Sequence, residues 1–179
     1  KVVILLAHPN IKESQANKAL VDAVSDMEGV AVFNLYELSQ EIAFNVDEWS
    51  KIISDASAVI YQFPFYWMSA PSLLKKWQDE VFTFLSKTPA VAGKSLTVVT
   101  TTGSEYEAYR SGGRNRFTMD ELLRPYQVSA IHSGMSWQTP IVVYGMGTAD
   151  AGKNIAEGAN LYKQRVEMLI GSSNAGNNW

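Results

Sequence analysis

Four short segments of the chain are apolar at every or nearly every position: Val2–Ala7, Ala58–Phe63, Leu96–Val99 and Ile141–Tyr144. A strand with one face in water alternates apolar and polar residues, whereas a strand covered on both faces does not need to. These segments are therefore predicted to be buried strands of a parallel sheet. A fifth segment, residues 30–38, alternates more strongly and is predicted to be a strand nearer the edge.

Helical patterns separate the predicted strands. Apolar residues recur at helical spacing after Ser14 and after Pro71, and a final helix is expected over about residues 149–169. The sequence TMDE at 118–121 has the form of a capping box, and Pro125 is expected to end that helix quickly. The alternation of strands and helices predicts a doubly wound α/β fold with helices on both faces of the sheet.

Length and composition limit the classes of protein that fit. The 179 residues predict a single domain over residues 1–170 and a flexible tail over 171–179. A net charge of −3 provides no basic field for nucleic acid, and the absence of cysteine excludes disulfides and a catalytic thiol. The longest apolar runs have about six residues where a bilayer span needs roughly 20, so a cytoplasmic protein is expected.

The turn after the first predicted strand has the features of a phosphate site. In doubly wound sheets, ligands bind beyond the carboxyl ends of the strands. Ser14 precedes a helix, whose first backbone N–H groups, on Gln15, Ala16 and Asn17, have no partner within the helix. His8 supplies a further donor from the strand end. The alternative is that Ser14 is only a helix cap and His8 a loop residue.

The turn after the third predicted strand carries four consecutive large residues, Phe65, Tyr66, Trp67 and Met68. Consecutive side chains cannot all point inward, so some of them are expected at the rim of the sheet. Rings and backbone N–H groups at that rim suit a planar aromatic ligand. The alternatives are a plug in the core or a dimer contact.

The connection after the fourth predicted strand, residues 100–117, is the longest polar segment of the chain. Thr101, Thr102, Gly103 and Ser104 are predicted to present N–H and hydroxyl donors to the same ligand, because long loops in compact domains are often functional. The alternative is a mobile surface loop.

Other chemistries fit poorly. Residues 147–154, GTADAGKN, approach the phosphate-binding pattern G-x-x-x-x-G-K-[ST], but Asn154 stands where a hydroxyl residue would hold Mg²⁺. The two histidines, His8 and His132, are far apart in sequence and no carboxylate cluster has metal-ligand spacing, so no metal site is predicted. The nucleophile elbow G-x-S-x-G is absent as well.

Three motifs in order resemble the NAD(P)H:quinone oxidoreductase family with a flavodoxin-like fold. They are AHP followed by S-x-AN near the N-terminus, P-x-x-W with LLK-W-x-D-x-VF after the third strand, and TTG after the fourth. The later segment YRSGGRNRFTMDELLRP resembles the bacterial branch, which includes quinone reductases and the ancillary flavoproteins of glutathione-gated potassium efflux systems. The resemblance implies a five-stranded parallel sheet with strand order 2-1-3-4-5.

The resemblance also implies a bound flavin, with FMN expected and FAD as the alternative. His8 and residues 14–17 would hold its phosphate and ribityl region, Phe65–Met68 would line the isoalloxazine ring, and Thr101–Ser104 would close over its polar edge. NAD(P)H would be the hydride donor and a quinone the acceptor, by a ping-pong mechanism in a homodimer.

Two residues are expected to be catalytic. The family's animal quinone reductases pair a Tyr with a His in the loop after the fourth strand. Tyr109 matches the Tyr, and Asn115 falls at the His position with Arg114 and Arg116 beside it. A proton relay through imidazole is therefore absent from this loop, and Tyr109 would stabilise charge on the reduced flavin.

Two alternatives to the enzyme remain from the sequence. The first is a regulatory flavin-binding subunit that docks on a potassium efflux transporter at the inner membrane. The second is a flavodoxin-type one-electron carrier, which the modest net charge and the segment HPNIKES fit less well.

Overall fold

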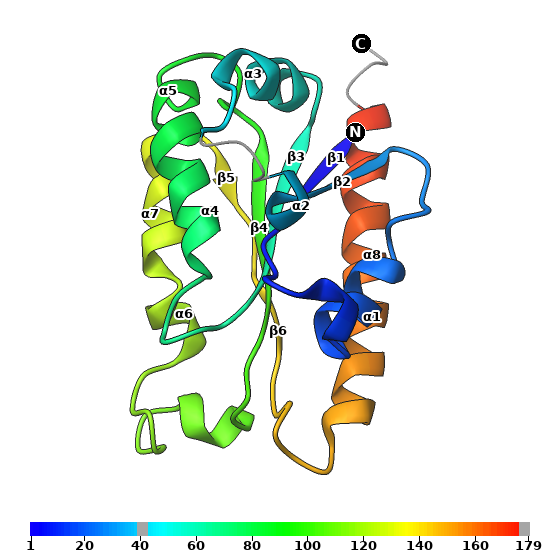
Figure 1. The fold of residues 1–179 in the computed structure, drawn as a ribbon, viewed down its shortest axis with the longest axis vertical. Coiled ribbons are helices and arrows are strands. Elements are labelled where there is room, and N and C mark those ends of the chain that lie inside the picture. The colour runs from blue at the N-terminus through cyan, green and yellow to red at the C-terminus, as the bar shows by residue number, and fades with distance from the viewer. Residues whose placement is uncertain (39–42, 176–179) are drawn as a thin grey trace.

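The computed structural model describes residues 1–38 and 43–175 and shows a parallel sheet between two layers of helices (Figure 1). All pairings in the sheet are parallel, and the order is β2-β1-β3-β4, with β5 and β6 both beside β4. The strands are β1 (Val2–Leu6), β2 (Val30–Asn34), β3 (Ala58–Pro64), β4 (Ser95–Thr101), β5 (Ser136–Trp137) and β6 (Ile141–Val143).

The fifth position of the sheet is one interrupted strand. β5 pairs with the start of β4, where Ser95 faces Ser136, and β6 pairs with its end, where Thr101 faces Val143. The two segments follow one another along the same neighbour, with Pro140 in the break between them. The predicted five-stranded flavodoxin-like sheet with order 2-1-3-4-5 is therefore confirmed, its last strand being divided in two.

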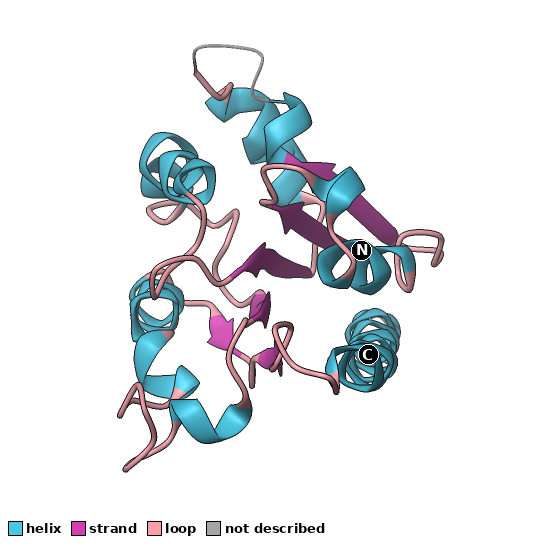
Figure 2. Ribbon diagram, turned by 60° about the horizontal axis from the view of Figure 1, so that its bottom comes forward, coloured by secondary structure: helices cyan, strands magenta, loops and turns pink. Residues whose placement is uncertain are grey.

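Helices cover both faces, as Figure 2 shows. One face carries η1 (Ile11–Glu13), α1 (Ala16–Asp22) and α8 (Ala151–Ala175). The other face carries the remaining helices: α2 (Leu35–Leu38), α3 (Val46–Ser54), α4 (Ser72–Trp77), η2 (Gln78–Phe82), α5 (Thr83–Leu85), η3 (Tyr106–Tyr109), α6 (Met119–Leu122) and α7 (Arg124–His132).

Each face of the sheet has its own core. Trp77 and Tyr61 lie in the core under α3, α4 and α7, and Tyr162 lies in the core under α1 and α8. α8 approaches the sheet closely at Gly158, where a Cβ atom would lie 2.4 Å from Val143 Cγ2. The strands are buried on both faces for this reason, which explains their unbroken apolar sequences.

Two helix boundaries differ in detail from the sequence prediction. The predicted capping box is confirmed, because Thr118 and Glu121 exchange side-chain-to-backbone hydrogen bonds at the start of α6. The capped helix α6 does end quickly, at Leu122, and a separate helix, α7, begins at Arg124. Pro125 lies in the first turn of α7, where its missing N–H leaves no helical acceptor unsatisfied. α8 continues through Ala175, and residues 176–179 lie outside the described residues.

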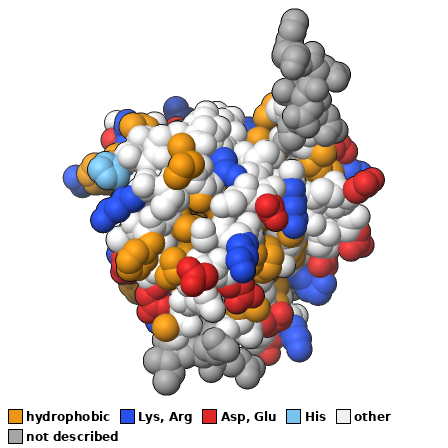
Figure 3. Space-filling view, turned by 90° about the horizontal axis from the view of Figure 1, so that it is seen from above, with side chains coloured by type: hydrophobic (Ala, Val, Ile, Leu, Met, Phe, Trp, Pro, Cys, Tyr) orange, Lys and Arg blue, Asp and Glu red, His pale blue; other side chains and the backbone are white. Residues whose placement is uncertain are grey.

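The amino end of the sheet carries scattered side chains of every type. Figure 3 shows hydrophobic, basic and acidic residues interspersed on this face, without a field of one charge. Within residues 1–38 and 43–175, no helix has the length and hydropathy needed to cross a bilayer.

Candidate functional site

The three turns singled out in the sequence meet at the carboxyl edge of the sheet, the lower end in Figure 1. β1, β3 and β4 are neighbours, and they end together. Ala7 N–H donates to Gln62 O at 2.9 Å, and Phe65 N–H donates to Thr101 O at 2.9 Å. These bonds continue the sheet by one residue beyond the strands and fix where each turn begins.

The first turn encloses a cavity of about 210 Å³. Ser14 Oγ accepts the Asn17 N–H at 3.0 Å, so Ser14 does cap this turn. The backbone N–H groups of Gln15 and Ala16 find no acceptor among the described residues. Two unpaired donors beside a small cavity fit a phosphate group. The lining residues are His8, Ser14, Gln15, Ala16, Asn17, Pro64, Thr101, Met146, Ala151 and Ile155.

A buried polar network lies beneath this cavity. The Asn17 side chain, with 1% of its surface exposed, donates from Nδ2 to Thr101 Oγ1 at 3.1 Å. Gln62, which is fully buried, donates from Nε2 to the Asn17 carbonyl oxygen at 2.8 Å. Buried polar groups without partners are costly, so these bonds join α1, β3 and β4 at one point.

His8 lies at the cavity wall with a defined tautomer. Its Nδ1 accepts the Asn10 N–H at 3.0 Å, which leaves Nε2 as the protonated donor of the neutral ring. Partial burial lowers the pKa of His8, because the imidazolium form loses hydration there. His8 therefore serves as a neutral hydrogen-bond donor at neutral pH.

The second turn, which we call the aromatic turn (Phe65–Met68), exposes its side chains at the rim. Trp67 has 95% of its surface exposed. Tyr66 N–H donates to Ser69 O at 2.8 Å and Ser69 N–H donates to Tyr66 O at 3.0 Å, closing a two-residue turn. Both central residues have positive φ, 46° at Trp67 and 63° at Met68. Such conformations cost about 1–3 kcal/mol each in non-glycine residues and concentrate at functional sites.

The third turn is fixed by the turn that follows β6. Thr102 N–H donates to Val143 O at 2.9 Å, and the carbonyl of Thr102 accepts from Met146 at 2.9 Å. The N–H groups of Gly103 and Ser104 have no acceptor among the described residues, and Gly103 faces open space. Two of the predicted N–H donors are therefore available to a ligand, while that of Thr102 is already bonded.

Tyr109 lies at the end of η3 in a cluster of aromatic rings. Its ring is 6.2 Å from Phe65 and 5.9 Å from Tyr144, and Tyr106 lies 5.3 Å from Tyr144. Burial raises the pKa of Tyr109 against the opposing effects of Ser104 and Arg114, and burial, with Asp120 nearby, raises the pKa of Tyr144 to about 12. Both phenols therefore keep their protons at neutral pH and can donate hydrogen bonds.

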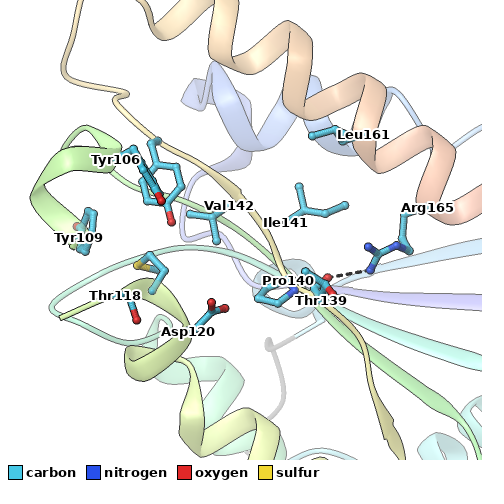
Figure 4. Close-up of a pocket in the computed structure, with 12 residues that line it drawn as sticks. Tyr106, Tyr109, Thr118, Asp120, Thr139, Pro140, Ile141, Val142, Leu161 and Arg165 are labelled. Carbon is cyan, nitrogen blue, oxygen red and sulfur yellow. Dashed lines mark hydrogen bonds between the residues drawn. The ribbon is translucent and has the colours of Figure 1, made fainter. Parts of the chain in front are cut away.

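The tyrosine cluster borders a cavity of about 470 Å³ at the open edge of the sheet, between α6 and α8 (Figure 4). Asp120 and Arg165 lie at this cavity, and Arg165 Nη1 donates to Thr139 O at 2.8 Å. Tyr109 therefore stands between the aromatic turn on one side and this edge cavity on the other.

Asn115 lies close to Tyr109 along a folded-back loop. Asn115 N–H donates to Ala108 O at 2.9 Å, and Gly113 approaches Glu107 so closely that a Cβ atom would lie 2.1 Å from its carbonyl oxygen. The Asn115 side chain makes no hydrogen bond to a described residue, so its catalytic role stays a prediction. Arg114 instead donates from Nη2 to Ser104 Oγ at 2.7 Å and ties the loop to the third turn.

Sequence reasoning missed one wall of the cavity at the first turn. Met146, Ala151 and Ile155 line it from the turn after β6 and the start of α8. Ala151 belongs to the segment 147–154, which approaches the phosphate-binding pattern in sequence, but the start of that segment supports the third turn instead. Gly147 N–H donates to Gly103 O at 2.9 Å, where a side chain at Gly147 would be crowded.

Two curated relatives match most of the chain. An uncharacterized NAD(P)H oxidoreductase, YdeQ of Bacillus subtilis, is 35% identical over 94% of this chain and 87% of its own. The ancillary protein KefG of the glutathione-regulated potassium-efflux system of Serratia proteamaculans is 36% identical over 80% of this chain and 81% of its own.

Two solved structures share the fold along nearly the whole chain. General stress protein 14 of Treponema denticola, solved in complex with FMN, has a TM-score of 0.86 and 30% identity over 94% of this chain and 99% of its own. An NADPH-quinone reductase from P. pentosaceus has a TM-score of 0.78 and 27% identity over 92% and 96%.

The family with a flavodoxin-like fold matches residues 1–166, which is nearly the full described structure. The match covers all three turns at the carboxyl edge, including the two with unpaired N–H donors. This chain is a member of the flavodoxin-like family of NAD(P)H oxidoreductases and quinone reductases.

Proposed function

We propose that this protein is a flavin-dependent NAD(P)H:quinone oxidoreductase that transfers two electrons from NAD(P)H to a quinone by a ping-pong mechanism. The observation that carries the proposal is the convergence of three sequence-distant turns at one rim. One turn has unpaired N–H groups beside a small cavity, one exposes aromatic side chains, and one presents two unpaired N–H groups. A relative with the same fold is solved with FMN.

The residues present fit FMN. His8 and the N–H groups of Gln15 and Ala16 would hold the phosphate, Phe65–Met68 would line the ring, and Gly103 with Ser104 would meet its polar edge. When bound, FMN would supply the redox chemistry, accepting two electrons from NAD(P)H and releasing them to the acceptor.

Groups of the chain itself would orient the flavin and stabilise the negative charge that develops on it. Thr101 shares its hydroxyl with Asn17 and so anchors the phosphate end to β4. The protonated phenol of Tyr109 and the N–H groups of Gly103 and Ser104 are fixed donors where negative charge develops, as at oxyanion sites. Trp67 would exclude water from one side of the ring. A homodimer would cover the exposed apolar side chains of the aromatic turn.

The test combines composition with turnover. Heat release followed by mass measurement should yield FMN rather than FAD, and purified protein should oxidise NADH or NADPH only when a quinone is supplied. Parallel lines in double-reciprocal plots would support the ping-pong mechanism. Folded protein that carries FMN but shows no quinone-dependent oxidation with either donor would contradict the enzymatic proposal.

A second candidate is favoured by the similarity to KefG. In that role the protein would bind flavin and dock on a potassium efflux transporter, and turnover would be incidental. Co-purification with such a transporter, together with negligible quinone turnover at saturating NAD(P)H, would select this candidate over the enzyme.

A further inference from the structure

A small number of hydrogen bonds hold the aromatic turn in its conformation, in which two non-glycine residues have positive φ. Its entrance is fixed by the hydrogen bond from Phe65 N–H to Thr101 O, and its middle by the paired bonds between Tyr66 and Ser69. The paired bonds across this two-residue turn require the positive φ values of Trp67 and Met68, which are strained in non-glycine residues. Among the described residues, no strand forms a hydrogen bond with Ala70 at the exit of the turn, and the hydrogen bond found there comes from another element.

That element is α7, through the hydroxyl of Tyr126. Ala70 N–H donates to Tyr126 Oη at 3.2 Å, and Ser69 Oγ lies 3.5 Å from the same oxygen. Among the described residues, Tyr126 Oη is the acceptor found for the Ala70 N–H. The contact joins two elements that are 56 residues apart in sequence.

The position of this hydroxyl is set by the core. Tyr126 has 6% of its surface exposed. Its ring centroid lies 5.4 Å from that of Phe63 and 6.2 Å from that of Tyr61, so the ring has little freedom to move. Because the core fixes the ring of Tyr126, its hydroxyl group has a fixed position and holds the turn at the surface in place.

We infer that Tyr126 is a positioning residue of the candidate flavin site, whose hydroxyl holds the aromatic turn in the conformation that presents Phe65–Met68 to the ring. Tyr126 does not line the rim itself and acts through Ala70. The ligand in this inference rests on the proposed function, whereas the anchoring contact does not. Neither the sequence motifs nor the comparisons assign a role to Tyr126.

The test separates the hydroxyl from the ring. Tyr126→Phe keeps the packing against Phe63 and removes the hydroxyl that accepts from Ala70 and contacts Ser69 Oγ. Tyr162→Phe is the matched control: its hydroxyl is also buried, lies on the opposite face under α8 and has no hydrogen-bond partner among the described residues. Three quantities are measured for each: amide hydrogen exchange of Tyr66 and Ser69 in flavin-free protein, the dissociation constant for FMN, and the circular dichroism of bound flavin.

Tyr126→Phe should speed exchange at Tyr66 and Ser69 by about three- to tenfold, the effect expected for one lost hydrogen bond. The dissociation constant for FMN should rise by a similar factor, because the binding-competent turn is populated less. The circular dichroism of bound flavin should change, since the ring's surroundings are altered. Tyr162→Phe should change none of these.

Unchanged exchange in Tyr126→Phe would overturn the anchoring contact. Faster exchange with the same FMN affinity would overturn the positioning role. If the unsubstituted protein bound no FMN, the proposed function would fall and the ligand named here with it, while the exchange measurement would still report on the anchor. The two failures are therefore told apart.

Discussion

The two ends of the candidate flavin site are held in opposite ways. The phosphate end rests on buried polar groups, with Asn17 and Gln62 bonded beneath the surface to β4 and α1. The ring end is a surface turn whose central side chain, Trp67, is almost fully exposed and whose backbone is strained. Folding alone therefore forms the phosphate end, whereas the ring end leaves side-chain surface exposed that a ligand or a second subunit can cover.

The largest expected effect is at the phosphate end. Asn17→Ala removes the donor to Thr101 Oγ1 and leaves buried groups unpaired, so the unfolding free energy of flavin-free protein should fall by about 2 kcal/mol, and FMN binding should weaken as well. Urea unfolding measures the first and fluorescence titration the second. Asn160→Ala, at an exposed position of α8, is the control. Equal unfolding midpoints for the two variants would show that the network does not support the fold.

The ring end should respond in the other way. Trp67→Ser should weaken FMN binding by about tenfold, as the loss of one stacked aromatic predicts, while changing the unfolding free energy by less than about 0.5 kcal/mol. Phe84→Ser, at an exposed aromatic on α5, is the control and should leave the FMN affinity unchanged. A purified Trp67→Ser variant with normal flavin content would contradict the role given to this turn.

A smaller effect is expected at Tyr109, which lies beside the ring end. Tyr109→Phe keeps the ring contacts with Phe65 and Tyr144 but removes the phenolic donor. The FMN content should stay unchanged, and reduction or reoxidation of the flavin should slow by about fivefold, the value of one neutral hydrogen bond. Stopped-flow absorbance follows each half-reaction. Unchanged rates in both would remove Tyr109 from charge stabilisation.

The smallest effect is a pH dependence at His8. Burial lowers its pKa in the folded protein, so the unfolded chain binds the proton more tightly. The stability of flavin-free protein should therefore decline as pH falls from about 6.5 through the folded-state pKa, and it should be fully present above that range. His8→Asn should flatten this part of the profile. A profile unaltered by the substitution would mean that other groups cause the decline.

The fold was largely predictable because a strand that is buried on both faces has an unbroken apolar sequence. Segments such as Val2–Ala7 and Ala58–Phe63 became strands with boundaries shifted by one residue. The first part of the last strand, β5, was not predicted because it has only two residues, Ser136 and Trp137, although Pro140 between β5 and β6 cannot donate to the ladder and marks the break. The short helix before Pro125 was predicted and α6 does end at Leu122, but the start of α7 beside Pro125 was not, because a proline in a first helical turn and a proline after a helix look alike in sequence.

The candidate site was predictable in its location and only partly in its contacts. Ser14, Asn17 and Thr101 were identified because polar residues after neighbouring parallel strands must meet at one edge. The positive φ values at Trp67 and Met68 could not be predicted from the sequence, because neither residue type favours that conformation. The contacts of Tyr126 and Met146 depend on how distant elements pack, which no local pattern records.

The central claim is that the three turns form one flavin site, and titration of flavin-free protein with FMN tests it most directly. Quenching of flavin fluorescence should saturate at one FMN per chain, and Asn17→Ala should weaken the binding more than Trp67→Ser does. Folded protein that binds neither FMN nor FAD at concentrations far above those of the protein would contradict the claim.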